Sequence, residues 1–151
     1  MLSLLSTTTH INLHLLTKLF DSMIKPIATY GSEVWASEYL FKIVQTKDRV
    51  KVLKQLDKLP FEKVHNRFCK RILGVYTSTS NVFSRAEIGR LPLSLFISVQ
   101  IIKYWIYLTK LPRDRIVYQA YEGEKHLDKK CIKSWTSFVR EILYRLDFGQ
   151  I

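Results

Sequence analysis

Four cationic side chains are spaced so that one face of a helix would carry them all. Lys63, Arg67, Lys70 and Arg71 follow one another at short intervals, and their positions fall on the same side of an α-helix. Ammonium and guanidinium groups aligned in this way can hold the phosphates of a nucleic acid without reading its bases. The spacing therefore predicts a sequence-independent phosphate-binding surface.

Two further cations bracket the turn that follows. Arg85 and Arg90 lie on either side of Gly89, a residue suited to closing a short helix. We expect them to extend the phosphate contact, helped by backbone N–H groups at the start of that short helix near Ser80.

The residue types that metal and nucleophilic chemistry require are poorly represented. His10 and His14, and likewise His65 and Cys69, are four residues apart, but each pair offers two ligands where a structural zinc site needs four. Metal-assisted phosphoryl transfer needs clustered carboxylates, and no two adjacent Asp residues occur in the chain. We therefore expect no metal, no cofactor and no enzymatic activity from this chain as it stands.

The cationic residues belong to a predicted helix between Pro60 and Gly74. Proline fits the first turn of a helix and glycine the position just past its end. The predicted inward face carries four apolar residues: Phe61, Val64, Phe68 and Ile72. If this face is buried, the four cations point into solvent.

A long apolar segment at residues 93–110 is the predicted centre of the fold. Apolar residues occupy nearly its whole circumference, which is typical of a helix buried in a bundle or in a membrane. Polar residues interrupt it, and we therefore favour the bundle and expect no membrane association. Trp105 in this segment, together with Trp35 and Trp135, lies in an apolar pattern that indicates core packing rather than base stacking.

Helical periodicity also organises the rest of the chain. Residues 11–30 predict one amphipathic helix, kinked by Pro26 near residues 22–25. Residues 113–121 predict a short helix, 122–130 a charged loop and 130–146 a last helix, whereas 36–59 remain undecided.

Composition supports a single all-α protein. The chain has 151 residues, is 47% hydrophobic and contains only five Gly and four Pro, too few for a turn-rich β domain. We predict an irregular bundle of five to seven helices around a central apolar helix at residues 93–110, covered by the kinked N-terminal helix and the last helix. The two cysteines, Cys69 and Cys131, give no disulfide framework. An intracellular location is therefore expected, with nucleus and cytoplasm both open.

The charge distribution points to a polyanionic partner. The net charge is +11, and residues 51–110 alone carry 11 basic and 3 acidic side chains. The positive excess therefore coincides with the predicted cationic helix, as a phosphate-binding surface requires.

Three blocks of sequence resemble a known protein family. The blocks LFDSMIKPIATYGSEVW at 19–35, VHNRFCKRILGV at 64–75 and AEIGRLPL at 86–93 are similar to the segment downstream of the palm in reverse transcriptases of non-LTR (LINE-type) retrotransposons. In that family the segment supplies the helical thumb, which grips the template and primer duplex. The resemblance implies a thumb-like region at 1–111 and a C-terminal helical extension at 112–151 packed on it.

The resemblance also implies what is missing. The family's palm carries a motif of Tyr or Phe, any residue, Asp and Asp, whose carboxylates bind two metal ions, and this motif is absent here. The chain is therefore expected to be a fragment or degraded copy of an RNA-directed DNA polymerase that binds an RNA/DNA duplex or another nucleic acid. Its other expected partners are the missing polymerase domains.

One alternative from another functional class stays open. A helical protein–protein interaction module would use the aromatic surface to bind a protein, and the positive charge would then serve solubility alone. Salt separates the two, because duplex binding weakens steeply as salt rises.

Overall fold

The chain is helical throughout its described elements, as the composition predicts. The computed structural model describes residues 13–129 and 134–148. Its elements in chain order are α1 (Leu13–Leu19), the π-helical segment η1 (Phe20–Ile24), α2 (Lys25–Thr29), α3 (Ser32–Val44), α4 (Arg49–Leu56), α5 (Pro60–Leu73), α6 (Asn81–Glu87), α7 (Leu93–Thr109), α8 (Ile116–Lys129) and α9 (Trp135–Arg145). The all-α class is confirmed. Counted with α1, η1 and α2 as one rod, the described part of the chain has eight helices, one more than expected.

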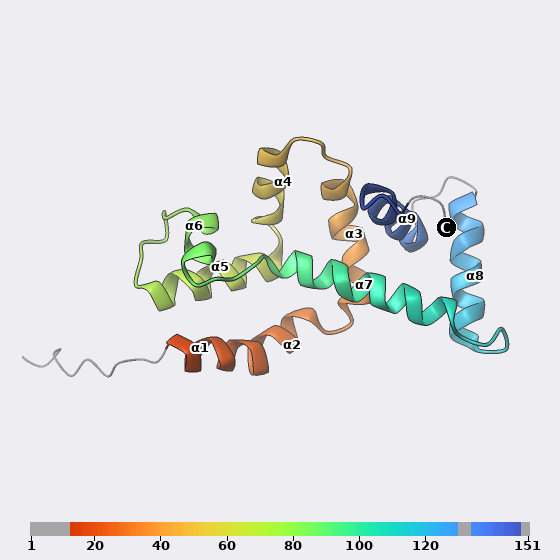
Figure 1. Ribbon diagram of the computed structural model, residues 1–151, viewed down its shortest axis with the longest axis horizontal. Coiled ribbons are helices and arrows are strands. Elements are labelled where there is room, and N and C mark those ends of the chain that lie inside the picture. The colour runs from red at the N-terminus through yellow and green to blue at the C-terminus, as the bar shows by residue number, and fades with distance from the viewer. Residues whose placement is uncertain (1–12, 130–133, 149–151) are drawn as a thin grey trace, which may run out of the picture.

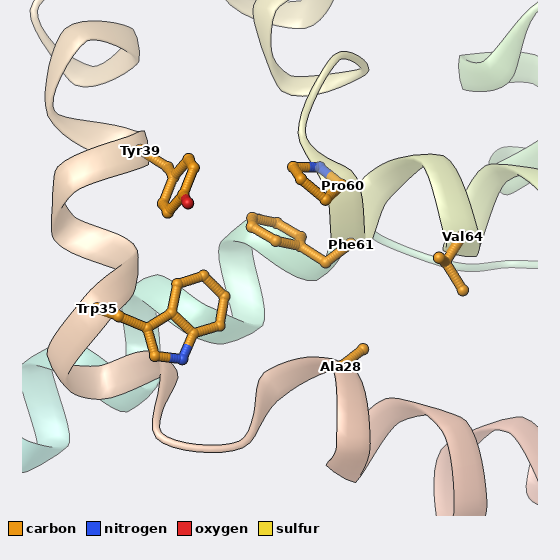
Figure 2. Close-up of a pocket in the computed structure, with 6 residues that line it drawn as sticks. All are labelled: Ala28, Trp35, Tyr39, Pro60, Phe61 and Val64. Atoms are coloured by element: carbon orange, nitrogen blue, oxygen red, sulfur yellow. The ribbon is translucent and has the colours of Figure 1, made fainter.

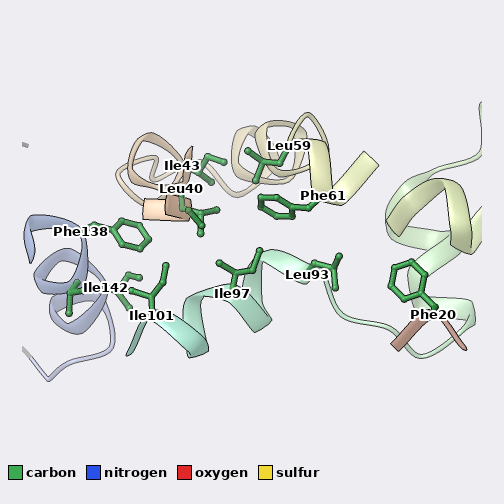
Figure 3. Close-up of a cluster of buried hydrophobic side chains, with 12 residues drawn as sticks. Phe20, Leu40, Ile43, Leu59, Phe61, Leu93, Ile97, Ile101, Phe138 and Ile142 are labelled. Carbon is green, nitrogen blue, oxygen red and sulfur yellow. The ribbon is translucent and has the colours of Figure 1, made fainter. Parts of the chain in front are cut away.

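The long apolar helix α7 lies at the centre, with other helices along its length (Figure 1). Ile97 and Ile101 on α7 are fully buried. They belong to one hydrophobic cluster with Leu40 of α3 and Phe138 of α9 (Figure 3). The expected N-terminal rod is not the main cover, because α3 makes the most extensive contact with α7. Only one face of α7 is buried, and apolar residues such as Leu95 on its other face are exposed.

The N-terminal rod is irregular where the kink was predicted. Pro26 has no N–H and its ring crowds the preceding turn, and the five residues before Lys25 adopt the wider π-helical turn. Gly31 then takes a left-handed conformation (φ 63°), which ends the rod and lets the chain turn into α3. The turn sets Trp35 of α3 close to the end of α2.

The charged segment after residue 121 is helical, so the predicted loop there is wrong. Tyr121 is buried on α8, and its hydroxyl accepts a hydrogen bond from Trp105 Nε1 at 3.1 Å. Glu124 accepts from the backbone N–H of Trp135 at 3.2 Å. These contacts to α7 and α9 stabilise a helix whose exposed charges suggested solvated coil.

The last helix, α9, packs into the same hydrophobic core as the helices before it. Ser134 caps α9 through a capping box with Ser137, and the start of the predicted helix, residues 130–133, lies outside the described residues. Phe138, Val139 and Ile142 of α9 are buried in the same cluster as the side chains of α3 and α7.

None of the helices in the described ranges combines the length and the apolar character that a membrane span requires.

Candidate nucleic-acid interface

Helix α5 begins and ends as its sequence predicts. Pro60 occupies the first helical position, and Gly74 closes the helix with a left-handed backbone (φ 65°). The backbone N–H of Val75 then donates to the carbonyl of Lys70 at 3.1 Å, which satisfies a carbonyl that would otherwise lack a helical partner. These local signals fix the length of the helix that carries the candidate site.

The outward face of α5 carries the four predicted cations. Lys63, Arg67 and Arg71 are exposed, and Lys70 is half-buried. Lys70 donates from Nζ to the carbonyl of Thr77 at 2.6 Å. None of the four forms an ion pair with a carboxylate in the described ranges. Their positive charge is therefore not neutralised by acidic side chains of this part of the chain.

The spacing of the exposed cations gives the surface its length. Lys63, Arg67 and Arg71 recur every four residues, which places the first and last about 12 Å apart along the helix axis. This length corresponds to about three or four base-pair steps of duplex DNA. Several consecutive phosphates could thus meet one side of α5.

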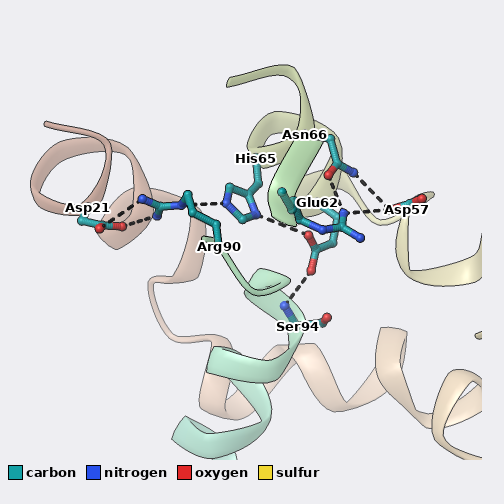
Figure 4. A network of polar contacts seen from close by, with 8 residues as sticks. Asp21, Asp57, Glu62, His65, Asn66, Arg90 and Ser94 are labelled. Atoms are coloured by element: carbon teal, nitrogen blue, oxygen red, sulfur yellow. Dashed lines mark hydrogen bonds and ion pairs between the residues drawn. The ribbon is translucent and has the colours of Figure 1, made fainter. Parts of the chain in front are cut away.

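The inward face of α5 differs from the predicted apolar stripe. Val64 is exposed and Phe68 and Ile72 are only half-buried. The buried residues are instead Phe61 together with four that are mostly polar: Glu62, His65, Asn66 and Cys69. The buried face is turned toward these polar residues, and three of them, Glu62, His65 and Asn66, meet polar partners from other parts of the chain (Figure 4).

Arg85 is one of those partners, and its burial leaves it unable to extend the phosphate contact as expected. The residue is only 3% exposed. Its guanidinium donates to Asp57 Oδ1 at 2.9 Å and to Asn66 Oδ1, and Asn66 donates in turn to Asp57. Burial works to raise the pKa of the Asp57 carboxyl, but hydrogen bonds from Asn81 and Arg85 outweigh it and hold the pKa below its ordinary value. Arg85 therefore connects α6 to α5.

Arg90 also points inward and pairs within the protein, so it is not placed to extend the phosphate contact as expected. Its Nε donates to Nε2 of the buried His65 at 3.0 Å, and its terminal nitrogens pair with the carboxylate of Asp21. Its guanidinium also lies over the ring of Phe20, 5.0 Å from the centroid. Arg90 thus ties the loop before α7 to the N-terminal rod and to α5.

The buried carboxylate of Glu62 completes this network. Its Oε1 accepts the backbone N–H of Ser94 at 2.7 Å, at the start of α7, where a negative charge is favourable. Its Oε2 lies 3.6 Å from His65 Nδ1. His65 Nε2 accepts from Arg90, whereas Glu62 Oε2 and His65 Nδ1 form no hydrogen bond within the described residues. The network orients α5 against α7.

The two potential metal ligands on α5 are packed inside the protein. His65 and Cys69 are buried, and burial raises the pKa of the Cys69 thiol. No group of three or more His, Cys, Asp or Glu side chains in the described ranges could hold a metal ion. His10 and Cys131 lie outside the described residues.

The tryptophans divide between core and surface. Trp105 and Trp135 pack against the hydrophobic cluster, as predicted. Trp35 is 37% exposed and lines a pocket beside α5 (Figure 2), so its assignment to the core is wrong.

The polar partners of α5 were not identified from the sequence. Asp57 and Asp21 are separated from their arginines by 28 and 69 residues, so no local spacing reveals the pairs. A weak signal did exist for Glu62, His65 and Asn66, which recur at helical spacing and therefore share a side.

Comparison of the chain with protein-family models, curated proteins and solved structures finds no match.

Proposed function

We propose that the chain is a thumb-like fragment of a non-LTR retrotransposon reverse transcriptase that holds RNA/DNA duplex through the outward face of α5. The observation that carries the proposal is the row formed by Lys63, Arg67 and Arg71, with Lys70 beside it, exposed and without carboxylate partners in the described ranges. Such a row attracts phosphates and releases their counterions. Contacts to phosphates carry no sequence information, so binding through this row would be independent of sequence.

The inward-facing arginines have a positioning role in this proposal. Arg85 and Arg90 hold α5 to α6, to the N-terminal rod and to the start of α7. The cations on the outward face therefore sit on a fixed support, which lowers the cost of ordering them when a ligand binds. The chain supplies positive charge and position, and the metal-dependent chemistry belongs to a palm.

Charge reversal on α5 tests the proposal directly. The variant with Lys63, Arg67, Lys70 and Arg71 changed to Glu should lose binding to an RNA/DNA duplex, measured by fluorescence anisotropy at low salt. The matched control reverses four exposed cations near the far end of α7, Lys103, Lys110, Arg113 and Arg115. Each variant lowers the net charge from +11 to +3, so only position separates them.

The slope of binding against salt gives a second readout. For the wild-type chain, the logarithm of the association constant should fall with the logarithm of salt by about 0.9 per phosphate contacted. Changing the four α5 cations to Gln should flatten this slope without adding negative charge. Circular dichroism should show the same helix content in all variants. Equal duplex affinity in the α5 variants and the control would refute the proposal, as would absence of binding by the wild-type chain at low salt.

A second candidate function rests on a different surface. Leu19, Met23, Ile27 and Tyr30 are exposed along the N-terminal rod, and contiguous exposed apolar side chains are typical of a protein-binding surface. A protein interaction module, or a contact with the missing polymerase domains, would use this row. Changing Ile27 and Tyr30 to Ser should then abolish association with a palm-containing polypeptide and leave duplex binding unchanged.

A further inference from the structure

An open apolar pocket lies directly beside the cationic face of α5. Its volume is about 430 Å³, within the range of small-molecule sites. It lies where α2, α3 and the first turns of α5 meet (Figure 2). Its lining residues are Ala28, Trp35, Tyr39, Pro60, Phe61 and Val64.

Aromatic rings form most of the wall of this pocket. Trp35 and Tyr39 meet edge to face with their centroids 5.8 Å apart, and Trp35 and Phe61 are 6.1 Å apart. Trp35 and Tyr39 are 37% and 49% exposed, so part of each ring is available to a ligand. The pocket thus offers ring surfaces to a flat, apolar group.

The indole ring is held in place before any ligand arrives. Trp35 Nε1 donates to the carbonyl of Tyr30 at 2.8 Å, across the turn at Gly31. A Cβ at Gly31 would lie 3.7 Å from the indole Cδ1, so the turn packs directly against the ring. A fixed aromatic ring loses little freedom on binding, which favours affinity.

The pocket and the cations share the same helix. Pro60 and Val64 line the pocket, and Lys63 and Arg67 lie three residues after each of them, which makes them neighbours on the helix surface. On α3, the exposed acid Glu38 is followed one turn later by the exposed Lys42. The charge beside the pocket is therefore positive on the α5 side and balanced on the α3 side.

A planar apolar group flanked by negative charges matches both features. We propose that this pocket takes an unpaired nucleobase from a single-stranded segment whose neighbouring phosphates lie on Lys63 and Arg67. Every base has a π-face, so stacking on these rings tolerates any sequence, in agreement with a surface that reads no bases. The inference rests on the proposed nucleic-acid function and adds single-stranded segments to the ligands of α5.

Oligonucleotides with and without bases test this inference. The probes are two single strands of about 12 nucleotides, within the size range that single-strand-binding domains cover. One is oligothymidine, and the other carries abasic sites at its central positions, so both present the same phosphates. The wild-type chain should bind the base-bearing strand at least about fivefold more tightly, as expected for one stacked base.

Two variants remove the pocket without touching the cations. Val64→Phe should fill it from the rim, and Tyr39→Ala should remove one wall. Both should abolish the preference for the base-bearing strand while keeping the affinity for the abasic strand. The controls are Val99→Phe on α7 and Tyr144→Ala on α9, exposed positions of the same residue types, which should keep the preference. Thermal unfolding checks that each variant folds.

The possible outcomes separate this inference from the proposal on which it rests. Reversal of the four α5 cations should weaken both strands equally. If the wild-type chain binds both strands alike, or if the pocket variants keep the preference for bases, the base-binding inference fails while the cationic surface stands. Either of these two results would indicate that the pocket instead receives an apolar side chain of a protein partner. If the wild-type chain binds neither strand at low salt, both proposals fail.

Discussion

The pair between Arg85 and Asp57 shows how a cation can serve the fold rather than a ligand. Arg85 lies almost entirely out of solvent, and Asp57 supplies the negative charge that a buried guanidinium requires. Asn66 bonds to both residues and fixes their geometry. A charge-reversal variant at Arg85 would therefore report on stability, and any loss of binding could not be assigned to phosphate contact.

Acid should weaken this pair. The pKa of Asp57 is lower in the folded chain than its ordinary value, so its contribution to the free energy of unfolding is complete above about pH 4 and is lost as the pH falls through the folded pKa. Asp57→Asn should cost about 3 kcal/mol at pH 7, because Arg85 keeps a buried charge without a counter-charge. Urea unfolding at pH 7 and pH 3 should show this cost shrinking in acid.

An exposed aspartate provides the control for that measurement. Asp114 is exposed, and Asp114→Asn should change the free energy of unfolding by less than about 0.5 kcal/mol at either pH. A cost at Asp57 that is the same at pH 7 and pH 3 would show that the carboxylate charge is not what stabilises Arg85.

At the scale of single residues, spacing predicted exposure better than it predicted partners. The outward placement of Lys63, Arg67 and Arg71 follows from positions within one helix, a local property that periodicity captures. The partners of Arg85 and Arg90 depend on which helices meet in the fold. The residues next to each arginine in the sequence do not indicate which helices those are. Both arginines looked like ligands for phosphate because an isolated charge is usually solvated.

The elements are defined by local signals at their ends. Proline at the start and glycine at the end fixed α5, and Gly89 (φ 70°) closes the segment after α6 as expected. The helix α8 was missed at its second half because its apolar support is thin. Its contacts with Trp105 and Trp135 come from other helices, and tertiary contacts of this kind override weak local preference.

Two glycines give opposite predictions at this scale. Gly74→Ala should lower the free energy of unfolding by about 1 to 2 kcal/mol, because a Cβ is unfavourable at φ 65°. Gly123→Ala should raise it by about 0.5 to 1 kcal/mol, because Gly123 lies inside α8, where an added Cβ would meet no atom within 4 Å beyond its own stretch of helix. Denaturant unfolding of the two variants measures both changes. The same sign for both would contradict the backbone assignments.

At the scale of the whole molecule, the boundary predicted between residues 1–111 and 112–151 runs through one hydrophobic core to which both parts contribute. Phe138 of α9 is fully buried in the cluster that holds Leu40 of α3 and Ile101 of α7, and its ring lies 6.3 Å from that of Phe41. Trp135 adds a hydrogen bond from Nε1 to the carbonyl of Glu33 at 2.7 Å. The sequence predicted that the C-terminal helix packs on the preceding region, but it could not show that α3 receives it.

This shared core predicts that α3, α7 and α9 unfold together. Phe138→Ala should lower the free energy of unfolding by about 3 to 5 kcal/mol, the usual cost of the cavity left by a buried phenylalanine. Native-state hydrogen exchange should show amides of α3 losing protection to the same extent as those of α9, because residues in one cooperative unit open together. Tyr144→Ala, at an exposed position on the same helix, is the control and should leave exchange in α3 unchanged. If α3 keeps its full protection while α9 opens in the Phe138 variant, residues 112–151 form an appendage and the preceding helices fold without them.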